Sequence, residues 1–138
     1  KIASLSQEEL DRGIVTASAG NHAQGVAYAA RERGAQATIV RPRITPRIKV
    51  DATRHLGATV ALEGEVFDES NAYAQRRSTQ EGMTYVAPFN DYEVLTGQGT
   101  IAMEILQDCP EVTDIIVPMG GGGLCAGIAM AVKTFAPH

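Results

Sequence analysis

The sequence of 138 residues predicts an α/β fold with an open, mainly parallel three-layer sheet that carries helices on both faces. Short apolar runs alternate regularly with longer amphipathic stretches, which is the rhythm that parallel βαβ units produce. The 44% hydrophobic content is enough for a buried core, and 14 Gly, 5% aromatic residues and no Trp indicate a mainly aliphatic one. The length allows one compact domain or a piece of a larger one.

Five apolar runs are predicted to be strands. Each is rich in Val, Ile, Thr or Tyr and is bounded by Gly, Pro or a charged residue. Their apolar character is nearly continuous, as expected for strands that are covered on both faces. The predicted strands are residues 13–18, 36–42, 58–63, 83–89 and 114–119.

Amphipathic stretches between these runs are predicted to be helices. The first three end at Gly34, Gly57 and Gly82, the residue type that most easily adopts a left-handed conformation after a helix. Ser6, with Glu9 three residues on, is a capping-box signature for a short opening helix. The predicted longer helices are residues 21–33, 46–56, 65–81, about 92–108 and about 124–135.

Charge and cysteine usage exclude several classes of function. The net charge of −4 and the pI near 5.3 provide no basic field for nucleic acid or a membrane surface. No apolar run approaches the length of about 20 residues that spans a bilayer. Cys109 and Cys125 form no disulfide framework and no metal-ligand pattern, so we expect no metal and a reducing, cytoplasmic setting.

A run of four glycines, Gly120 to Gly123, lies directly after the predicted strand 114–119 and directly before the last helix. Unpaired N–H groups and the helix dipole at such a turn favour a phosphate group. Neither the GxxxxGK[ST] motif nor the GxGxxG context of nucleotide sites is present, so a monophosphate cofactor is expected. From the glycines alone, a flexible connector is the alternative.

A polar cluster occurs at a second strand end, where the helix 21–33 begins. Ligands of open parallel sheets bind at this edge. A helix-capping role for Ser18 or Asn21 would explain one of these residues but not the whole cluster. The cluster comprises Ser18, Ala19, Gly20, Asn21, His22 and Gln24.

Two other patterns are interpreted as structural. Gly97 and Gly99 lie within a helical pattern, where they weaken a helix, so close packing is the favoured reason for them. A basic stretch is interpreted as a solvated face because the chain as a whole is acidic. Its members are Arg41, Arg43, Arg47, Lys49 and Arg54.

Together, four segments in this order resemble the threonine ammonia-lyases (threonine dehydratases), which are fold-type-II enzymes that depend on pyridoxal 5′-phosphate. The resemblance runs along the whole chain and includes several motifs. The segments are residues 16–25 (TASAGNHAQG), 45–52 (TPRIKVDA), 97–100 (GQGT) and 120–124 (GGGGL).

This resemblance implies roles for individual residues. The glycine loop Gly120, Gly121, Gly122 and Gly123, with the Leu124 amide, would hold the cofactor phosphate. Asn21 matches the residue that hydrogen-bonds the cofactor 3′ oxygen. The loop matching the substrate-carboxylate site comprises Ser18, Ala19, Gly20 and His22.

The implied reaction converts L-threonine to 2-oxobutanoate and ammonia, with the cofactor as electron sink. Ala19 favours elimination, because the related serine racemases have a serine at this position. Serine dehydratase and serine racemase activities of the same family are the alternatives, and a non-catalytic α/β fragment is another. The substrate would be a small amino acid, the complete enzyme a homo-oligomer, and isoleucine biosynthesis its setting.

The resemblance also implies that the chain is a central segment. The Schiff-base lysine of the family would precede Lys1, and neither Lys49 nor Lys133 lies in the matching motif. No catalytic residue is therefore assigned, and the isolated chain is expected to be inactive. Residues 3–108 would form most of the small lobe, and residues 112–138 a strand, the glycine loop and a helix of the large lobe.

Overall fold

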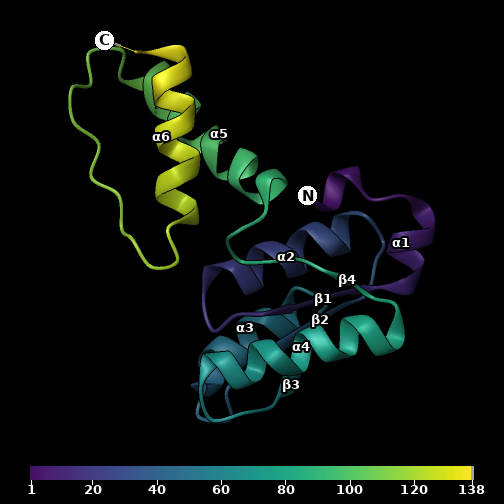
Figure 1. Cartoon of the computed structure of the whole chain (residues 1–138). Coiled ribbons are helices and arrows are strands. Elements are labelled where there is room, and N and C mark those ends of the chain that lie inside the picture. The colour runs from purple at the N-terminus through teal and green to yellow at the C-terminus, as the bar shows by residue number, and fades with distance from the viewer. Residues whose placement is uncertain (138) are drawn as a thin grey trace. The chain divides into compact units, whose positions relative to one another are not determined.

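A computed structural model describes residues 1–137 and divides the chain into two compact units. Unit 1 comprises residues 1–86 and unit 2 begins at Ala87. Figure 1 traces unit 1 from purple to teal and unit 2 from green to yellow. His138, the last residue of the predicted segment 112–138, lies outside the described residues.

Unit 1 contains a four-stranded parallel sheet in the order β3-β2-β1-β4. In the register, Val15 of β1 pairs with Thr38 of β2 and with Tyr85 of β4. The predicted strands 13–18, 36–42 and 58–63 are confirmed, with somewhat shorter bounds. The strands are β1 (Ile14–Ala17), β2 (Ala37–Arg41), β3 (Thr59–Leu62) and β4 (Thr84–Tyr85).

Helices cover both faces of this sheet, as the sequence predicts. α2 (Asn21–Glu32) and α3 (Arg47–His55) contact each other and lie on one face, whereas α4 (Phe67–Glu81) packs on β1 and β2 from the other (Figure 1). Right-handed crossovers require this arrangement, because the chain moves outward from β1 to β3 and then returns to the opposite side of β1 as β4. β1 and β2 are completely buried between the layers.

The helix ends follow the local sequence signals. α1 (Gln7–Arg12) begins with the predicted capping box, in which the Ser6 side chain accepts from the Glu9 amide and the Glu9 carboxylate accepts from the Ser6 amide. It follows a 3₁₀ turn, η1 (Ile2–Ser4). Gly34, Gly57 and Gly82 all have positive φ after their helices, as predicted.

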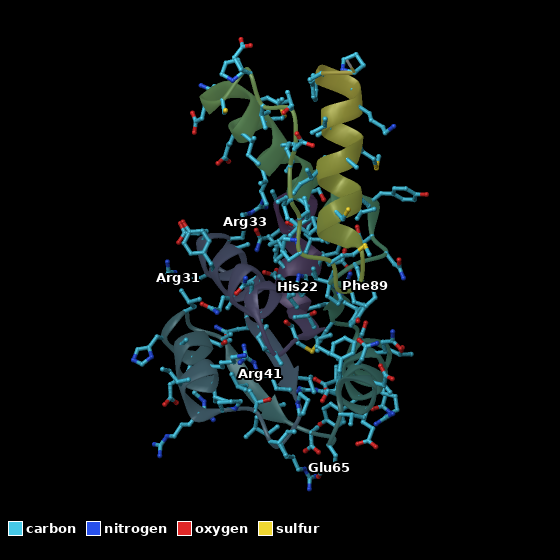
Figure 2. All side chains as sticks on the ribbon, turned by 90° about the vertical axis from the view of Figure 1, so that its left-hand side faces the viewer. His22, Arg31, Arg33, Arg41, Glu65 and Phe89 are labelled. Atoms are coloured by element: carbon cyan, nitrogen blue, oxygen red, sulfur yellow. The ribbon has the colours of Figure 1, made fainter. Side chains whose placement is uncertain are left out.

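Arg41 departs from the solvated basic face that the sequence predicts. It is the last residue of β2, has a relative exposure of 0% and reaches α3, where it donates to the Lys49 carbonyl at 2.8 Å and to Thr53 Oγ1 at 2.6 Å (Figure 2). Its Nε has no partner within residues 1–137, and burial lowers the pKa of its guanidinium. The prediction is wrong here because the strand, and not the helix, carries Arg41 into the core. The other four basic residues are exposed.

Arg41→Met should leave the free energy of unfolding unchanged or raise it by about 1–3 kcal/mol, since the desolvated charge is paired with no carboxylate among residues 1–137. Thr53 Oγ1 donates to the Lys49 carbonyl at 3.0 Å, so neither oxygen loses its last hydrogen bond. Arg41→Lys, the matched control, should lower it, because one ammonium does not reproduce the guanidinium fork. Urea unfolding measures both variants, and a clear loss in Arg41→Met would show that the buried charge is stabilising.

Unit 2 consists mainly of two helices, α5 (Tyr92–Asp108) and α6 (Gly123–Phe135). The Asp91 side chain caps α5 by accepting from the amides of Glu93 and Val94. The helices pack closely where glycines meet: a Cβ on Gly99 would lie 3.1 Å from the Gly127 carbonyl oxygen. The predicted packing role is therefore confirmed for Gly99, whereas a Cβ on Gly97 would have nothing within 4 Å.

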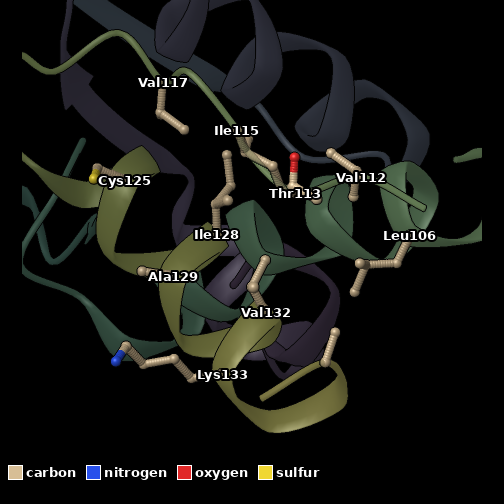
Figure 3. A pocket seen from close by; sticks show the side chains of 11 residues that line it. Leu106, Val112, Thr113, Ile115, Val117, Cys125, Ile128, Ala129, Val132 and Lys133 are labelled. Carbon is tan, nitrogen blue, oxygen red and sulfur yellow. The ribbon is translucent and has the colours of Figure 1, made fainter. Parts of the chain in front are cut away.

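Residues 114–119, predicted to be a strand, form none in the structure. The segment is extended along α6, with Ile115 facing the Ile128 side chain, and the two line an apolar groove (Figure 3). Ile116, the next residue along, has a relative exposure of 98%. A strand requires a hydrogen-bonded neighbour, and the described part of unit 2 contains no second strand to pair with it. The predicted strand 83–89 likewise ends at Tyr85.

Among residues 1–137, no helix combines the length and apolar character that a membrane crossing requires.

Candidate functional site

The polar cluster that follows β1 lies at the carboxyl edge of the sheet, as predicted. The Ser18 amide donates to the Val40 carbonyl at 3.1 Å, and the Ser18 hydroxyl accepts from the Gly20 amide at 3.2 Å. These bonds hold the loop between β2 and the start of α2, with Ser18 only 8% exposed. Ala19 and Asn21 are exposed at the turn itself.

The N-terminus of α2 is open. Gly20 is its N-cap residue, and no side chain in the described part of the chain caps the helix, so neither Ser18 nor Asn21 acts as the cap. The first-turn amides of Asn21, His22 and Ala23 precede the first intrahelical hydrogen bond. Because these N–H groups and the helix dipole favour negative charge, this edge is suited to a carboxylate or phosphate.

The half-buried ring of His22 lies within unit 1, against β1 and the residue that follows β4. Its Nε2 lies 3.2 Å from Thr16 Oγ1 and 3.2 Å from the Val86 carbonyl oxygen. The Thr16 hydroxyl donates to the same carbonyl at 2.6 Å. Burial lowers the pKa of His22 from its ordinary value of 6.5, and the bond to Val86 only partly opposes this shift.

This shift predicts a pH dependence of stability. Because the folded-state pKa lies below the unfolded value, the unfolded state binds the proton more readily as the pH falls through 6.5. The free energy of unfolding should therefore be fully retained above that value and decrease below it. Urea unfolding at pH values from about 5 to about 8, on both sides of the histidine pKa, measures this decrease in the free energy of unfolding. In His22→Gln this component should be absent; an unchanged pH profile would assign it to other groups.

The glycine loop of unit 2 forms a second open helix end. Gly122 is the N-cap residue of α6 with φ 83° and ψ −15°, a left-handed conformation that glycine adopts without strain. No side chain caps the helix, and its first described bond runs from the Ala126 amide to the Gly122 carbonyl. The amides of Gly123 and Leu124 therefore precede the first helical hydrogen bond.

Phe89 explains why two more residues of this loop are glycine. A Cβ on Gly121 would overlap the Phe89 ring, and a Cβ on Gly123 would lie 3.0 Å from Phe89 Cβ. Asn90, with φ 60°, turns the chain between Phe89 and α5. Sequence reasoning missed Phe89, because no local pattern connects it with a loop some thirty residues later.

These features fit a phosphate group. The loop presents bare backbone, a left-handed glycine and uncapped amides at a helix N-terminus, and side chains in place of Gly121 and Gly123 would disrupt it. Lys49 and Lys133, which the sequence analysis places outside the Schiff-base motif, lie exposed on α3 and α6. Within residues 1–137, no group of three His, Cys, Asp or Glu side chains is placed to hold a metal ion.

An open helix end after a strand of an α/β sheet and a glycine loop that fits a phosphate group are typical of cofactor-binding enzymes of the α/β class. The family of pyridoxal-phosphate dependent enzymes matches residues 1–138. The chain belongs to this family.

Known relatives agree in sequence and structure. An L-threonine ammonia-lyase of Thermotoga maritima is 54% identical over 138 residues, which is 100% of this chain and 34% of that protein. The processed form of threonine deaminase isoform 2 from Solanum lycopersicum has a TM-score of 0.92 at 48% identity, covering 99% of this chain and 38% of that one. Maize serine racemase has a TM-score of 0.92 at 38% identity, with coverage of 99% and 41%.

The chain thus spans 34% to 41% of the length of these relatives. Its fold is that of fold-type-II pyridoxal-phosphate enzymes, and the cofactor expected from the sequence is the cofactor of the family. The expected resemblance to threonine ammonia-lyases is confirmed.

Proposed function

We propose that this chain is the central segment of an L-threonine ammonia-lyase, which converts L-threonine to 2-oxobutanoate and ammonia. The observation that carries the proposal is the 54% identity to the Thermotoga maritima enzyme over all 138 residues of the chain.

The glycine loop would hold the cofactor phosphate through the amides of Gly120 to Gly123 and of Leu124. Support comes from the absence of a side-chain cap on α6 and from the space that Phe89 leaves only for glycine. Once bound, pyridoxal 5′-phosphate supplies an electron sink that permits loss of the substrate α-proton and of the β-hydroxyl.

The loop after β1 would bind the substrate carboxylate. The first-turn amides of α2 have no side-chain cap among residues 1–137 and follow the carboxyl end of β1, and the Ser18 hydroxyl accepts from the Gly20 amide. The site would comprise Ser18, Ala19, Gly20 and His22, and the exposed side chain of Asn21 would reach the cofactor 3′ oxygen.

Ala19 distinguishes elimination from racemisation. Its methyl side chain cannot accept or deliver a proton, so the site lacks one group that racemisation would use on the opposite face of the substrate. The structural similarity to maize serine racemase makes racemisation the second candidate.

A chimera tests the proposal, with this chain in place of the matching 138 residues of the Thermotoga maritima enzyme. We expect the chimera to release 2-oxobutanoate from L-threonine and to exchange the α-proton no faster than it releases keto acid. A folded chimera that binds cofactor but forms no keto acid would contradict the lyase assignment, and dominant α-proton exchange would favour the racemase.

The wider assignment belongs to the same proposal. Residues 3–108 would belong to the small lobe, and residues 112–138 would give the large lobe a strand, the glycine loop and a helix. The extended segment 114–119 would then gain its missing strand neighbours from the rest of the protein. The Schiff-base lysine would lie outside this chain. The complete enzyme would be a cytoplasmic homo-oligomer in isoleucine biosynthesis.

A further inference from the structure

His22 can act on the loop after β1 in two ways. One is through its backbone amide, and the other is through its ring. The amide lies in the uncapped first turn of α2. The ring instead reaches across to β1 and to the residue that follows β4, where Nε2 lies 3.2 Å from both Thr16 Oγ1 and the Val86 oxygen. These two connections have different chemical consequences.

The hydrogen bonds determine which ring nitrogen carries the proton. The Val86 carbonyl only accepts, and the Thr16 hydroxyl already donates its hydrogen to it at 2.6 Å. His22 Nε2 must therefore carry the hydrogen and donate it to the Val86 carbonyl. In a neutral ring, Nδ1 is then a bare acceptor, which would repel a carboxylate and not bind it.

Other observations agree with a neutral ring. The pKa of the ring is shifted by burial and by the Val86 carbonyl alone. Among the described residues, no charged group of β1, β4 or α2 contributes to the shift. A half-buried ring without a carboxylate partner favours the uncharged state.

Val86 is also a special position in the chain. It is the last residue of unit 1, and β4 before it is only two residues long. Its amide donates to the Val15 carbonyl at 3.0 Å, while its carbonyl accepts from Thr16 and His22. The backbone amide and carbonyl of this one residue thus connect β1, the exit of β4 and the first turn of α2.

We propose that His22 is a positioning residue whose ring, as the Nε2–H tautomer, fastens the first turn of α2 to the Val86 carbonyl together with Thr16. The ring thereby orients the amides of the carboxylate loop and anchors the point where the chain leaves unit 1. It does not contact the substrate. This inference deepens the proposed function, because the loop that it orients is the proposed carboxylate site.

Two substitutions separate a positioning role from direct contact. A glutamine amide nitrogen reaches about as far as His Nε2, whereas an asparagine amide nitrogen reaches only about as far as Nδ1. In the chimera described above, His22→Gln should recover a large part of the activity that His22→Asn loses. For His22→Asn we expect kcat/KM to fall about tenfold, as for one lost hydrogen bond, since the Val86 carbonyl keeps its bond from Thr16.

Thr16→Val tests the same group from β1 without changing the loop. It should reproduce the direction of His22→Asn, and the double variant should lose more than the two single variants together, because it removes both side-chain donors from one carbonyl. Thr16→Ser, which keeps the hydroxyl, is the matched control and should stay close to the parent.

Hydrogen exchange gives a readout that is independent of activity. In His22→Asn and in Thr16→Val, amide exchange should rise in residues 18–24 and 84–90 but not in β2, and His22→Gln should restore protection. Two results would show substrate contact and overturn the proposal. In the first, His22→Asn retains activity while His22→Gln loses it. In the second, both variants lose activity equally and amide exchange is unchanged. Unchanged activity and exchange in every variant would also overturn it. If the parent chimera forms no keto acid, the lyase assignment fails, while the exchange results still decide the role of His22.

Discussion

Gly127→Ala should destabilise unit 2 by about 3 kcal/mol, the upper part of the range for overpacking in a closely packed interior. The added Cβ would overlap the Leu95 carbonyl oxygen and would lie 3.0 Å from the Gly99 amide nitrogen. Both atoms belong to the backbone of α5, so no side-chain rotation can relieve the contact, and the two helices must separate. Urea unfolding of the chain, followed by circular dichroism, measures the loss.

Gly97→Ala is the matched control on α5. A Cβ there would have nothing within 4 Å, and the residue is exposed. The substitution should raise the free energy of unfolding by up to about 1 kcal/mol, through helix propensity alone. If Gly127→Ala proved as stable as the parent chain, the close approach of α5 and α6 would be wrong.

Gly121→Ala should weaken cofactor binding about 10- to 100-fold, because overpacking of about 1–3 kcal/mol must be relieved by moving the glycine loop. The Cβ would overlap the Phe89 ring, and the amides that would hold the phosphate would move with the loop. Titration of the chimera with pyridoxal 5′-phosphate, followed by fluorescence, gives the Kd. Titration with inorganic phosphate as a competitor tests whether the weakened interaction is the one between the loop and the cofactor phosphate.

A second substitution makes this prediction specific. Phe89→Ala in the Gly121→Ala background removes the ring that the new Cβ would meet, so affinity should recover part of its loss. Gly120→Ala serves as the position-matched comparison, since its Cβ would have nothing within 4 Å, and its effect should be smaller. Equal losses at Gly120 and Gly121, without recovery by Phe89→Ala, would show that overlap with Phe89 is not the cause.

Local chemistry made several elements predictable from the sequence. The capping box at Ser6 needs only residues three apart, and the glycines after α2, α3 and α4 are required by positive φ at those positions. The alternation of apolar runs with amphipathic stretches likewise predicts the parallel sheet with helices on both faces, because each βαβ unit must bury its apolar face against the sheet. The same alternation places the polar cluster after a strand and the glycine loop before a helix.

Other features depend on contacts between residues far apart in the chain. Residues 114–119 have the composition of a strand, yet pairing needs a neighbour that the described chain does not offer. Arg41 looked like a surface cation, but its place at the end of a buried strand takes it to α3. Charge and periodicity within a short stretch of sequence do not reveal either outcome. Both depend on which distant segments pack against the residues concerned.

By itself, the sequence determined the class of fold, the ends of several helices and the two loops that precede a helix N-terminus, whereas the open state of both N-termini is a finding of the structure. These rest on periodicity, on capping and on the conformational freedom of glycine. Only the tertiary structure decided that Phe89 lies against the glycine loop and that the His22 ring is bonded to Thr16 and Val86. The physical reason is that a side chain's hydrogen-bond partners and the space around it are set by distant segments, which local patterns do not encode.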